Sequence, residues 1–349
     1  MTTTVSSPRR MERSAMHRPL LVVLDNRGEG PTMYNVRIED SDEPAMELRT
    51  FPRPFVCGAA LRNCSVFAVS GTTILGLPYV RRHTVVHDAV AHAAAPGPWL
   101  HGSKNLPVML PVGDDTVVVM DAILPRRGGA SSCSFEALRR LPGGEWHAFP
   151  LPQLLVGDVN FPKAARISAY FAVGARVWIS VAGKGTFTLD MGCGAWQMEG
   201  SWELPLRGRA MFVPELGAVV GLNHNADSLN DRRCLCALDV EARPPVLRRV
   251  WEETYPWESV QAGHAPWVDG VSLAYLGGGR FCICRPVTTE FTTKGLARHA
   301  TRDSISFLVV DVRRSPGGEL ELSKRGKLTY QGDWPAGNSP FPYFIQPSS

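Results

Sequence analysis

Apolar positions along the chain gather in short runs separated by glycine and other turn-forming residues, without a sustained helical period. The clearest unit lies between Ile167 and Pro205. It holds three apolar runs and then a segment that carries a tryptophan, namely residues 167–173, 176–181, 186–190 and 202–205. Short apolar runs bounded by turns are typical of β-strands. Four such strands in succession form one blade of a β-propeller, so the unit predicts a four-stranded antiparallel sheet.

The same order of runs recurs along the chain. Copies of the second run lie at residues 20–24, 73–77, 116–120, 176–181, 217–222 and 279–284, and copies of the third at 33–38, 84–88, 134–138, 186–190, 234–239 and 306–311. Most third-run copies lie about 50 residues apart, which is the kelch period. The last gap is longer because residues 287–302 are inserted. We predict an all-β fold, a six-bladed kelch-like β-propeller, since seven blades would leave too few residues per blade.

The expected propeller is one domain over residues 19–346, with a disordered tail at 1–18 and a short tail at 347–349. The first copy lacks an innermost run, and we expect residues 341–345 to supply it. The segment 135–141 has the composition of a short helix, but the repeat assigns it to a strand. Tryptophans follow the third run at a similar interval, at Trp146, at Trp196 or Trp202, and at Trp251. Their large apolar area predicts packing between neighbouring blades.

Composition agrees with many turns and excludes several classes of protein. Glycine (33) and proline (28) exceed average usage, and 44% hydrophobic with 20% charged residues excludes a disordered chain. No run approaches the roughly 18 apolar residues of a membrane span. Residues 1–18 are rich in Ser, Thr and Arg without an apolar core, so they do not resemble a secretory signal. We expect a cytoplasmic or nuclear protein; the alternative is an organelle transit peptide.

Several stretches resemble a plant family of uncharacterised proteins that is expanded in grasses and known only as a domain of unknown function. The matching stretches are Ile167–Tyr170, Gly185–Phe187, Gly200–Ala210, Pro244–Trp251 and Leu276–Cys284. The resemblance implies a kelch-like propeller and no particular activity. The chain is also similar to the kelch half of F-box/kelch proteins, but there is no room for an F-box before Leu20.

The histidines and cysteines are candidate metal ligands. His83, His87 and His92 would chelate an ion only from a helical face, whereas the repeat places the first two on a strand, so solvated or turn histidines are expected. Without a secretory signal, the eight cysteines are expected to be reduced. Two C-x-C pairs could bind zinc if they met, but the repeat puts them in different blades, at Cys234 and Cys236 and at Cys282 and Cys284.

The motifs of hydrolases, P-loop proteins and dinucleotide-binding proteins are absent from the sequence. Some kelch propellers are copper oxidases, which need converging Tyr, His and Cys ligands, and the sequence shows no such arrangement. We therefore predict no catalytic residue, no metal and no cofactor. The alternative is an enzyme with a pocket at the mouth of the propeller channel.

The formal net charge is only +4, but the predicted blades separate the charges. Loops expected at one end of every blade carry a set that we call the basic face: Arg62, Arg81, Arg82, Arg126, Arg127, Arg166, Lys184, Arg207, Arg209, Arg232 and Arg233, with Arg27, Lys104, Lys163, Lys294, Arg298 and Arg302 extending it. The opposite end is expected to collect the acids Asp40, Asp42, Glu43, Asp114, Asp115, Asp190, Glu215, Asp239 and Glu241.

A face of one charge sign steers partners of the opposite sign. The sequence therefore predicts a monomeric, non-enzymatic protein-interaction scaffold that binds an acidic protein partner or an anionic ligand on the basic face. The alternative is that these charges only keep the loops soluble. Nucleic acid is not favoured, because aromatic residues do not interleave with the basic ones.

Overall fold

The computed structural model describes residues 20–26, 30–36, 47–50, 64–78, 81–88, 91, 93–104, 106–124, 133–154, 156, 165–224, 232–256, 264–266, 271–290, 300–331 and 343–345. These residues form an all-β structure of mostly antiparallel sheets. Helical structure within them is limited to the 3-10 turns η3 (Pro214–Leu216) and η4 (Glu252–Thr254). No helix in this described part has the length and apolar character needed to span a membrane.

Consecutive strands pair with each other to form the sheets. The first complete set is β4 (Cys64–Ser70), β5 (Thr73–Pro78), β6 (His83–Asp88) and β7 (Ala93–Trp99), and the second is β8 (Pro107–Pro111), β9 (Thr116–Asp121), β11 (Phe135–Arg140) and β12 (Trp146–Pro150). Two further sets follow. The third set is β13 (Ala165–Val173), β14 (Arg176–Val181), β15 (Gly185–Asp190) and β16 (Ala195–Gly200), and the fourth is β17 (Leu206–Val213), β18 (Ala218–Asn223), β19 (Leu235–Asp239) and β20 (Val246–Trp251). The parallel pairing of β13 with β17 joins them into one sheet, to which β10 (Ile123–Leu124) also pairs.

The last sheet contains β22 (Ser272–Gly277), β23 (Arg280–Glu290), β24 (Ala300–Arg314) and β25 (Leu320–Gln331), with β21 (His264–Pro266) and β3 (Glu47–Thr50) at its margins. A small sheet joins β1 (Leu20–Asn26), β2 (Gly30–Val36) and β26 (Tyr343–Ile345). The expected contribution of residues 341–345 is confirmed for β26, because Val22 of β1 pairs with Phe344. The assignment of residues 135–140 to a strand is also confirmed.

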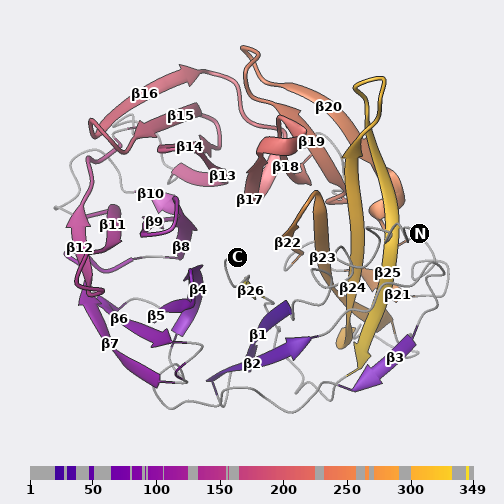
Figure 1. The fold of residues 1–349 in the computed structure, drawn as a ribbon, viewed down its shortest axis with the longest axis horizontal. Helices are drawn as coiled ribbons and strands as arrows, with labels where there is room; N and C mark the ends of the chain where they lie inside the picture. The colour runs from indigo at the N-terminus through magenta and orange to yellow at the C-terminus, as the bar shows by residue number, and fades with distance from the viewer. Residues whose placement is uncertain are drawn as a thin grey trace, which may run out of the picture.

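The sheets stand around a common centre, so the fold is propeller-like (Figure 1). The first strand of each complete set lies nearest the centre, and the last lies at the rim. Apolar clusters fill the spaces between neighbouring sheets. Trp251 is 1% exposed in a cluster built from β17–β19 and β22–β24, and Trp146 lies in a cluster shared by β4, β5, β8 and β9. The predicted packing of tryptophans between neighbouring sheets is therefore confirmed at these positions.

One feature differs from the sequence prediction, and a second one was not predicted. Residues 287–302 are not simply inserted between strands, because β23 continues to Glu290 and β24 begins at Ala300, with these two residues paired. The strand β3, which follows β2 in the chain, pairs in parallel with β25 instead of β2. Strand pairing over such long sequence separations depends on how the sheets meet in space, which local patterns do not encode.

Candidate functional site

Several predicted cations of the basic face lie at the same end of neighbouring sheets. β13 and β17 run parallel, so both begin at this end, and they carry Arg166 and Arg207 close to their starts. The turn between β14 and β15, which carries Lys184, lies beside Arg166, because the Ala182 N–H donates to the Arg166 carbonyl at 2.9 Å. Arg166, Arg207 and Lys184 therefore lie at one end of these strands.

Arg81 and Arg82 occupy the equivalent turn, between β5 and β6, and both are exposed. The Arg82 Nε donates to the Leu100 carbonyl at 2.7 Å, which ties this turn to the segment that leads into β8. Arg209 is partly buried in β17, and its Nε has no hydrogen-bond partner. Three predicted residues, Arg62, Arg126 and Arg127, lie outside the described residues, as do Arg27, Lys163, Lys294 and Arg298.

Two predicted cations are not on the surface. Arg233 is 8% exposed and Lys104 is 1% exposed. Lys104 lies instead beside the buried Glu136 of β11, and its Nζ donates to Glu136 Oε1 at 2.5 Å and to the Gly102 carbonyl at 3.0 Å. The prediction that Lys104 contributes to the basic face is wrong, because a lysine that finds a carboxylate partner can be buried against it.

The Glu136 carboxylate organises the segment that precedes β8. It accepts hydrogen bonds from the backbone N–H groups of His101 and Gly102, at 2.7 and 3.1 Å. Burial alone would raise the pKa of this carboxyl, but the hydrogen bonds from Lys104 and His101 outweigh it and lower the pKa. The arrangement has the properties of a structural ion pair, because both side chains are fully buried.

Several acids expected at the opposite end form hydrogen bonds or ion pairs with neighbouring residues. Asp190 accepts from the Gly192 N–H at 2.8 Å in the turn after β15, and Asp239 pairs with Arg248 of β20. The Tyr275 hydroxyl donates to Glu215. Asp114 and Asp115 are exposed, whereas Asp40, Asp42 and Glu43 lie outside the described residues. This end therefore presents fewer unengaged carboxylates than the sequence count suggested.

The candidate metal ligands are placed by the strands. His83 and His87 both belong to β6, and His92 lies outside the described residues. His87 is 2% exposed, so the interpretation of this residue as a solvated or turn histidine is wrong. The two C-x-C pairs lie in different sheets, one at the start of β19, with Cys234 directly before the strand, and the other in β23. Burial raises the pKa of each of these thiols.

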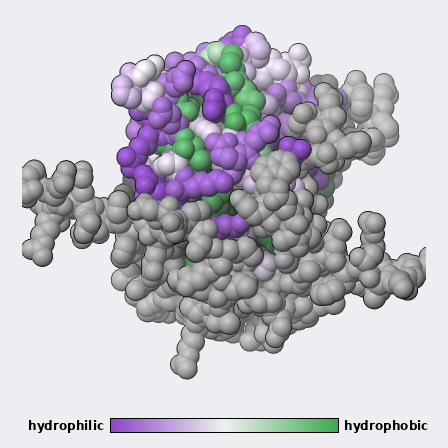
Figure 2. Space-filling view, turned by 90° about the vertical axis from the view of Figure 1, so that its right-hand side faces the viewer, coloured by the Kyte–Doolittle hydropathy of each residue, from purple (hydrophilic) through white to green (hydrophobic). Residues whose placement is uncertain are grey.

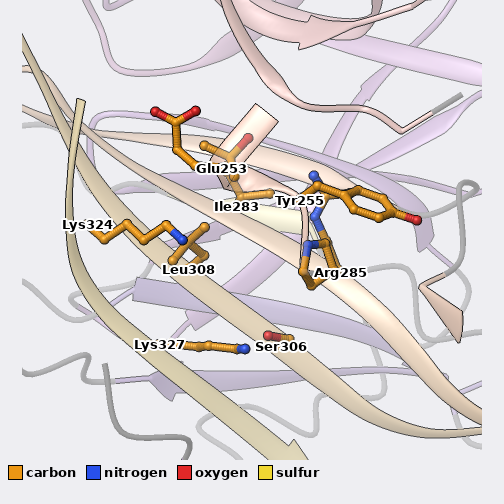
Figure 3. Close-up of a pocket in the computed structure, with 10 residues that line it drawn as sticks. Glu253, Tyr255, Ile283, Arg285, Ser306, Leu308, Lys324 and Lys327 are labelled. Carbon is orange, nitrogen blue, oxygen red and sulfur yellow. The ribbon is translucent and has the colours of Figure 1, made fainter. Parts of the chain in front are cut away.

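A cavity of about 150 Å³ lies where the last two sets of strands meet. It is lined from the η4 side by Glu253, Thr254, Tyr255 and Pro256, and from the sheet side by Ile283, Arg285, Ser306, Leu308, Lys324 and Lys327 (Figure 3). We call it the Arg285 pocket. The η4 side is held in place by the Thr254 hydroxyl, which accepts from the Leu235 N–H at 2.9 Å and donates to the Trp251 carbonyl at 2.6 Å.

Arg285 is the unusual residue of this pocket. Its side chain lies in β23 and is 4% exposed. Its two terminal nitrogens donate to the carbonyls of Arg232 and Arg233, at 3.3 and 2.5 Å, and its Nε has no hydrogen-bond partner. Burial lowers the pKa of Arg285 to about 10, which leaves the guanidinium charged at neutral pH. No carboxylate pairs with it among the residues that the structure describes.

The surroundings of Arg285 add positive charge and one aromatic ring. The guanidinium lies 5.7 Å from the centre of the Tyr255 ring, and Arg232 approaches the same ring at 5.9 Å. Lys324 and Lys327 enter from β25, while Glu253 is the acid among the lining residues. Figure 2, which faces the side where β24 and β25 lie, shows a mainly hydrophilic described surface broken by apolar patches.

Sequence reasoning missed the Arg285 pocket. The predicted run ends at residue 284, so no role was predicted for Arg285, and the only signal was a charge set directly after that apolar run. Lys324 and Lys327 belong to β25, a strand for which the repeating runs gave no prediction. Residues from three separated segments meet here, and no local pattern predicts that meeting.

Comparison with known proteins gives a family but no activity. A family model described as "Protein of unknown function (DUF1668)" matches residues 17–330. Among solved structures, the chain is similar to Kuenenia stuttgartiensis hydrazine synthase, at 12% identity and a TM-score of 0.44 over 75% of this chain. It is also similar to the extracellular domain of BT4673 from B. thetaiotaomicron, at 9% identity and a TM-score of 0.38 over 86% of this chain. The chain spans 66% of the first of these chains and 44% of the second. No curated protein sequence matches it.

Proposed function

The chain belongs to the DUF1668 family, and we propose that it is a non-enzymatic interaction scaffold that binds an acidic protein partner on its basic face. We further propose that its propeller-like fold is a six-bladed kelch-like propeller. The complete sets of strands around the centre and the pairing of β26 with β1 support six blades. The restriction of the family to plants, a cytoplasmic or nuclear location and a monomeric state stay predictions.

The observation that carries this proposal is the gathering of cations at one end of neighbouring sheets. Arg166 at the start of β13 and Arg81 in the β5–β6 turn are exposed, and Lys184 and Arg207 lie at the same end. Surface charges of one sign raise the local concentration of an oppositely charged partner and its rate of association. Such steering weakens with ionic strength because salt screens exposed charges.

The proposal is tested with a fluorescent acidic peptide that lacks phosphate, measured by anisotropy at low and high salt. The variant Arg166→Gln/Arg207→Gln removes two charges from the basic face, and Arg140→Gln/Arg249→Gln removes two exposed charges elsewhere. We expect the first variant to weaken binding by about three- to tenfold at low salt, since each exposed charge contributes up to about 1 kcal/mol. The second variant should bind like the unmodified protein. Equal binding by all three proteins, or binding that salt does not weaken, would contradict the proposal.

An enzyme with a pocket at the channel mouth was the alternative from the sequence. A tight cluster of His, Cys and Tyr or of carboxylates at the mouth of the channel would favour it, whereas a basic rim without such a cluster favours the interaction scaffold, which we develop further.

A further inference from the structure

We propose that the Arg285 pocket binds a dianionic phosphoryl group. This inference rests on the proposed function, because it names a ligand chemistry for a protein that we expect to bind anions. The residues that line the pocket do not include Arg166 or Arg207, although Arg285 donates to the carbonyls of Arg232 and Arg233 of the basic face. The uncompensated charge of Arg285, the convergence of other donors and the size of the cavity lead to this ligand in three steps.

The first step is the cost of burying Arg285. A buried cation is destabilising unless an anion and hydrogen bonds compensate it. Arg285 is 4% exposed, and its contacts are two backbone carbonyls and the face of Tyr255. A carbonyl dipole neutralises a guanidinium only in part, and the Nε proton has no acceptor. The residue thus has both a charge and a donor left for a ligand.

The second step is the register of the sheet, which aims further donors at the same cavity. Arg285 of β23 pairs with Ser306 of β24, so these two side chains lie on the same face of adjacent strands. Leu308 lies two residues further along β24 and pairs with Lys327 of β25. The Ser306 hydroxyl and the Lys327 ammonium therefore point to the face that carries Arg285, as Figure 3 shows.

A β-bulge in β25 brings a second lysine, Lys324, to the pocket. Residues three apart in a regular strand point to opposite faces, so Lys324 and Lys327 would ordinarily diverge. Val309 of β24 pairs with Gly326, but the next residue, Val310, pairs with Lys324. Arg325 is therefore an extra residue in β25. Because of this extra residue, the side chain of Lys324 lies on the same face of the sheet as that of Lys327. Bulges often re-aim a side chain toward a site, and this one brings both lysines to the pocket.

The third step is the match between this donor set and one ligand group. Three cations and a hydroxyl surround the cavity, against one acid, the exposed Glu253. A phosphoryl dianion offers three acceptor oxygens and up to two charges, whereas a carboxylate offers two oxygens and one charge. The volume of about 150 Å³ is below the roughly 300–1,000 Å³ of pockets for whole small molecules. It suits one charged group, either free phosphate or the phosphate of a modified side chain.

The test measures the thermal unfolding midpoint of the full chain against increasing inorganic phosphate, with sodium chloride at matched ionic strength and with sodium acetate as a monoanion. A ligand that binds only the folded state raises the midpoint with its concentration. We expect phosphate to raise it more than either salt. The variant Arg285→Met should weaken phosphate binding by about 10- to 100-fold, the loss expected for hydrogen bonds to a charged group.

Lys324→Gln is the second variant, because Lys324 is exposed and its replacement leaves the core unchanged. We expect it to weaken phosphate binding by about three- to tenfold, while Arg140→Gln leaves binding unchanged. A phosphate effect no larger than that of chloride would overturn the proposal. An effect that is equal in the unmodified protein, Arg285→Met and Lys324→Gln would also overturn it.

A second arm identifies the source of the phosphoryl group. A phosphoserine peptide and the same peptide with unmodified serine are titrated by anisotropy. Tighter binding of the phosphopeptide that disappears in Arg285→Met assigns the pocket to a phosphorylated segment, and binding of inorganic phosphate alone assigns it to a free anion. If neither binds while the acidic peptide still depends on Arg166 and Arg207, this inference fails and the proposed function stands.

Discussion

Replacing Lys104 by methionine tests the account of the buried ion pair that precedes β8. Both side chains of the Lys104–Glu136 pair are fully buried, and Nζ and Oε1 are 2.5 Å apart. Methionine is similar in length to the apolar stem of lysine, so Lys104→Met removes the charge and the donors with little change in volume. The carboxylate of Glu136 then stays buried with hydrogen bonds from the His101 and Gly102 backbone and a contact with His101 Nδ1 at 2.8 Å, but without the lysine cation.

The expected loss follows from that uncompensated charge. Removing one partner of a buried ion pair costs about 3–5 kcal/mol of unfolding free energy, because the remaining charge is desolvated without its counterion. The backbone N–H groups that still solvate Glu136 place the expected value for Lys104→Met near the lower limit, at about 3 kcal/mol. The exposed Arg140, on the same strand as Glu136, gives the matched control, since Arg140→Met should change stability by no more than about 0.5 kcal/mol.

The loss should also depend on pH. In the unmodified protein the pKa of Glu136 is lowered, so the carboxylate stabilises the fold above its unfolded pKa of about 4.3, and this contribution disappears as the pH falls through the folded value. Without Lys104, burial dominates and the folded pKa should rise above the unfolded one. The variant then regains stability as the pH falls toward about 4.3. The difference between the two proteins is therefore largest near pH 7 and narrows on acidification.

Urea unfolding followed by tryptophan fluorescence and circular dichroism at several pH values measures these differences, after coincidence of the two transitions has shown two-state behaviour. A loss below about 1 kcal/mol at pH 7 would refute the treatment of Lys104 as the counterion of a buried charge. A difference that stays constant between pH 7 and pH 5 would refute the assignment of the effect to Glu136.

The remaining predictions concern packing, backbone and thiol chemistry. Trp251→Ala should cost about 3–5 kcal/mol of unfolding free energy because the ring is 1% exposed, while Trp99→Ala, at 68% exposed, should cost no more than about 0.5 kcal/mol; similar losses would contradict the assignment of Trp251 to the core. Gly279→Ala should destabilise the fold more than Gly278→Ala, because both residues have positive φ but only at the former would a Cβ collide with a backbone carbonyl of β24; equal midpoints in thermal unfolding would exclude that collision. Cys193 is exposed in the native fold, so Cys193→Ser should remove one rapidly reacting thiol from a native titration with a thiol reagent, and an unchanged fast phase would show that this thiol is protected.

The repeating runs of the sequence were enough to predict an all-β, propeller-like arrangement of strands. Each strand is bounded by turns that its own residues favour, and its burial follows from its apolar side chains, so both properties are local. The pairing of β26 with β1 was also predicted, because an incomplete set of strands at the start left one place for an apolar run at the end. The end of the fold at which Arg166 and Lys184 lie followed from the same order of strands.

The sequence alone could not decide which charges are buried and which converge. Lys104 was expected on the surface and is buried, because β11, which lies far along the chain from the loop that carries Lys104, supplies its partner Glu136. Arg285 directly follows a predicted apolar run and had no predicted role, yet it lines a pocket with residues from η4 and β25. Local patterns specify strands and turns, whereas the environment of a charge depends on contacts between segments far apart in the chain. Desolvation and pairing act only after those segments have come together, so the tertiary structure alone decided them.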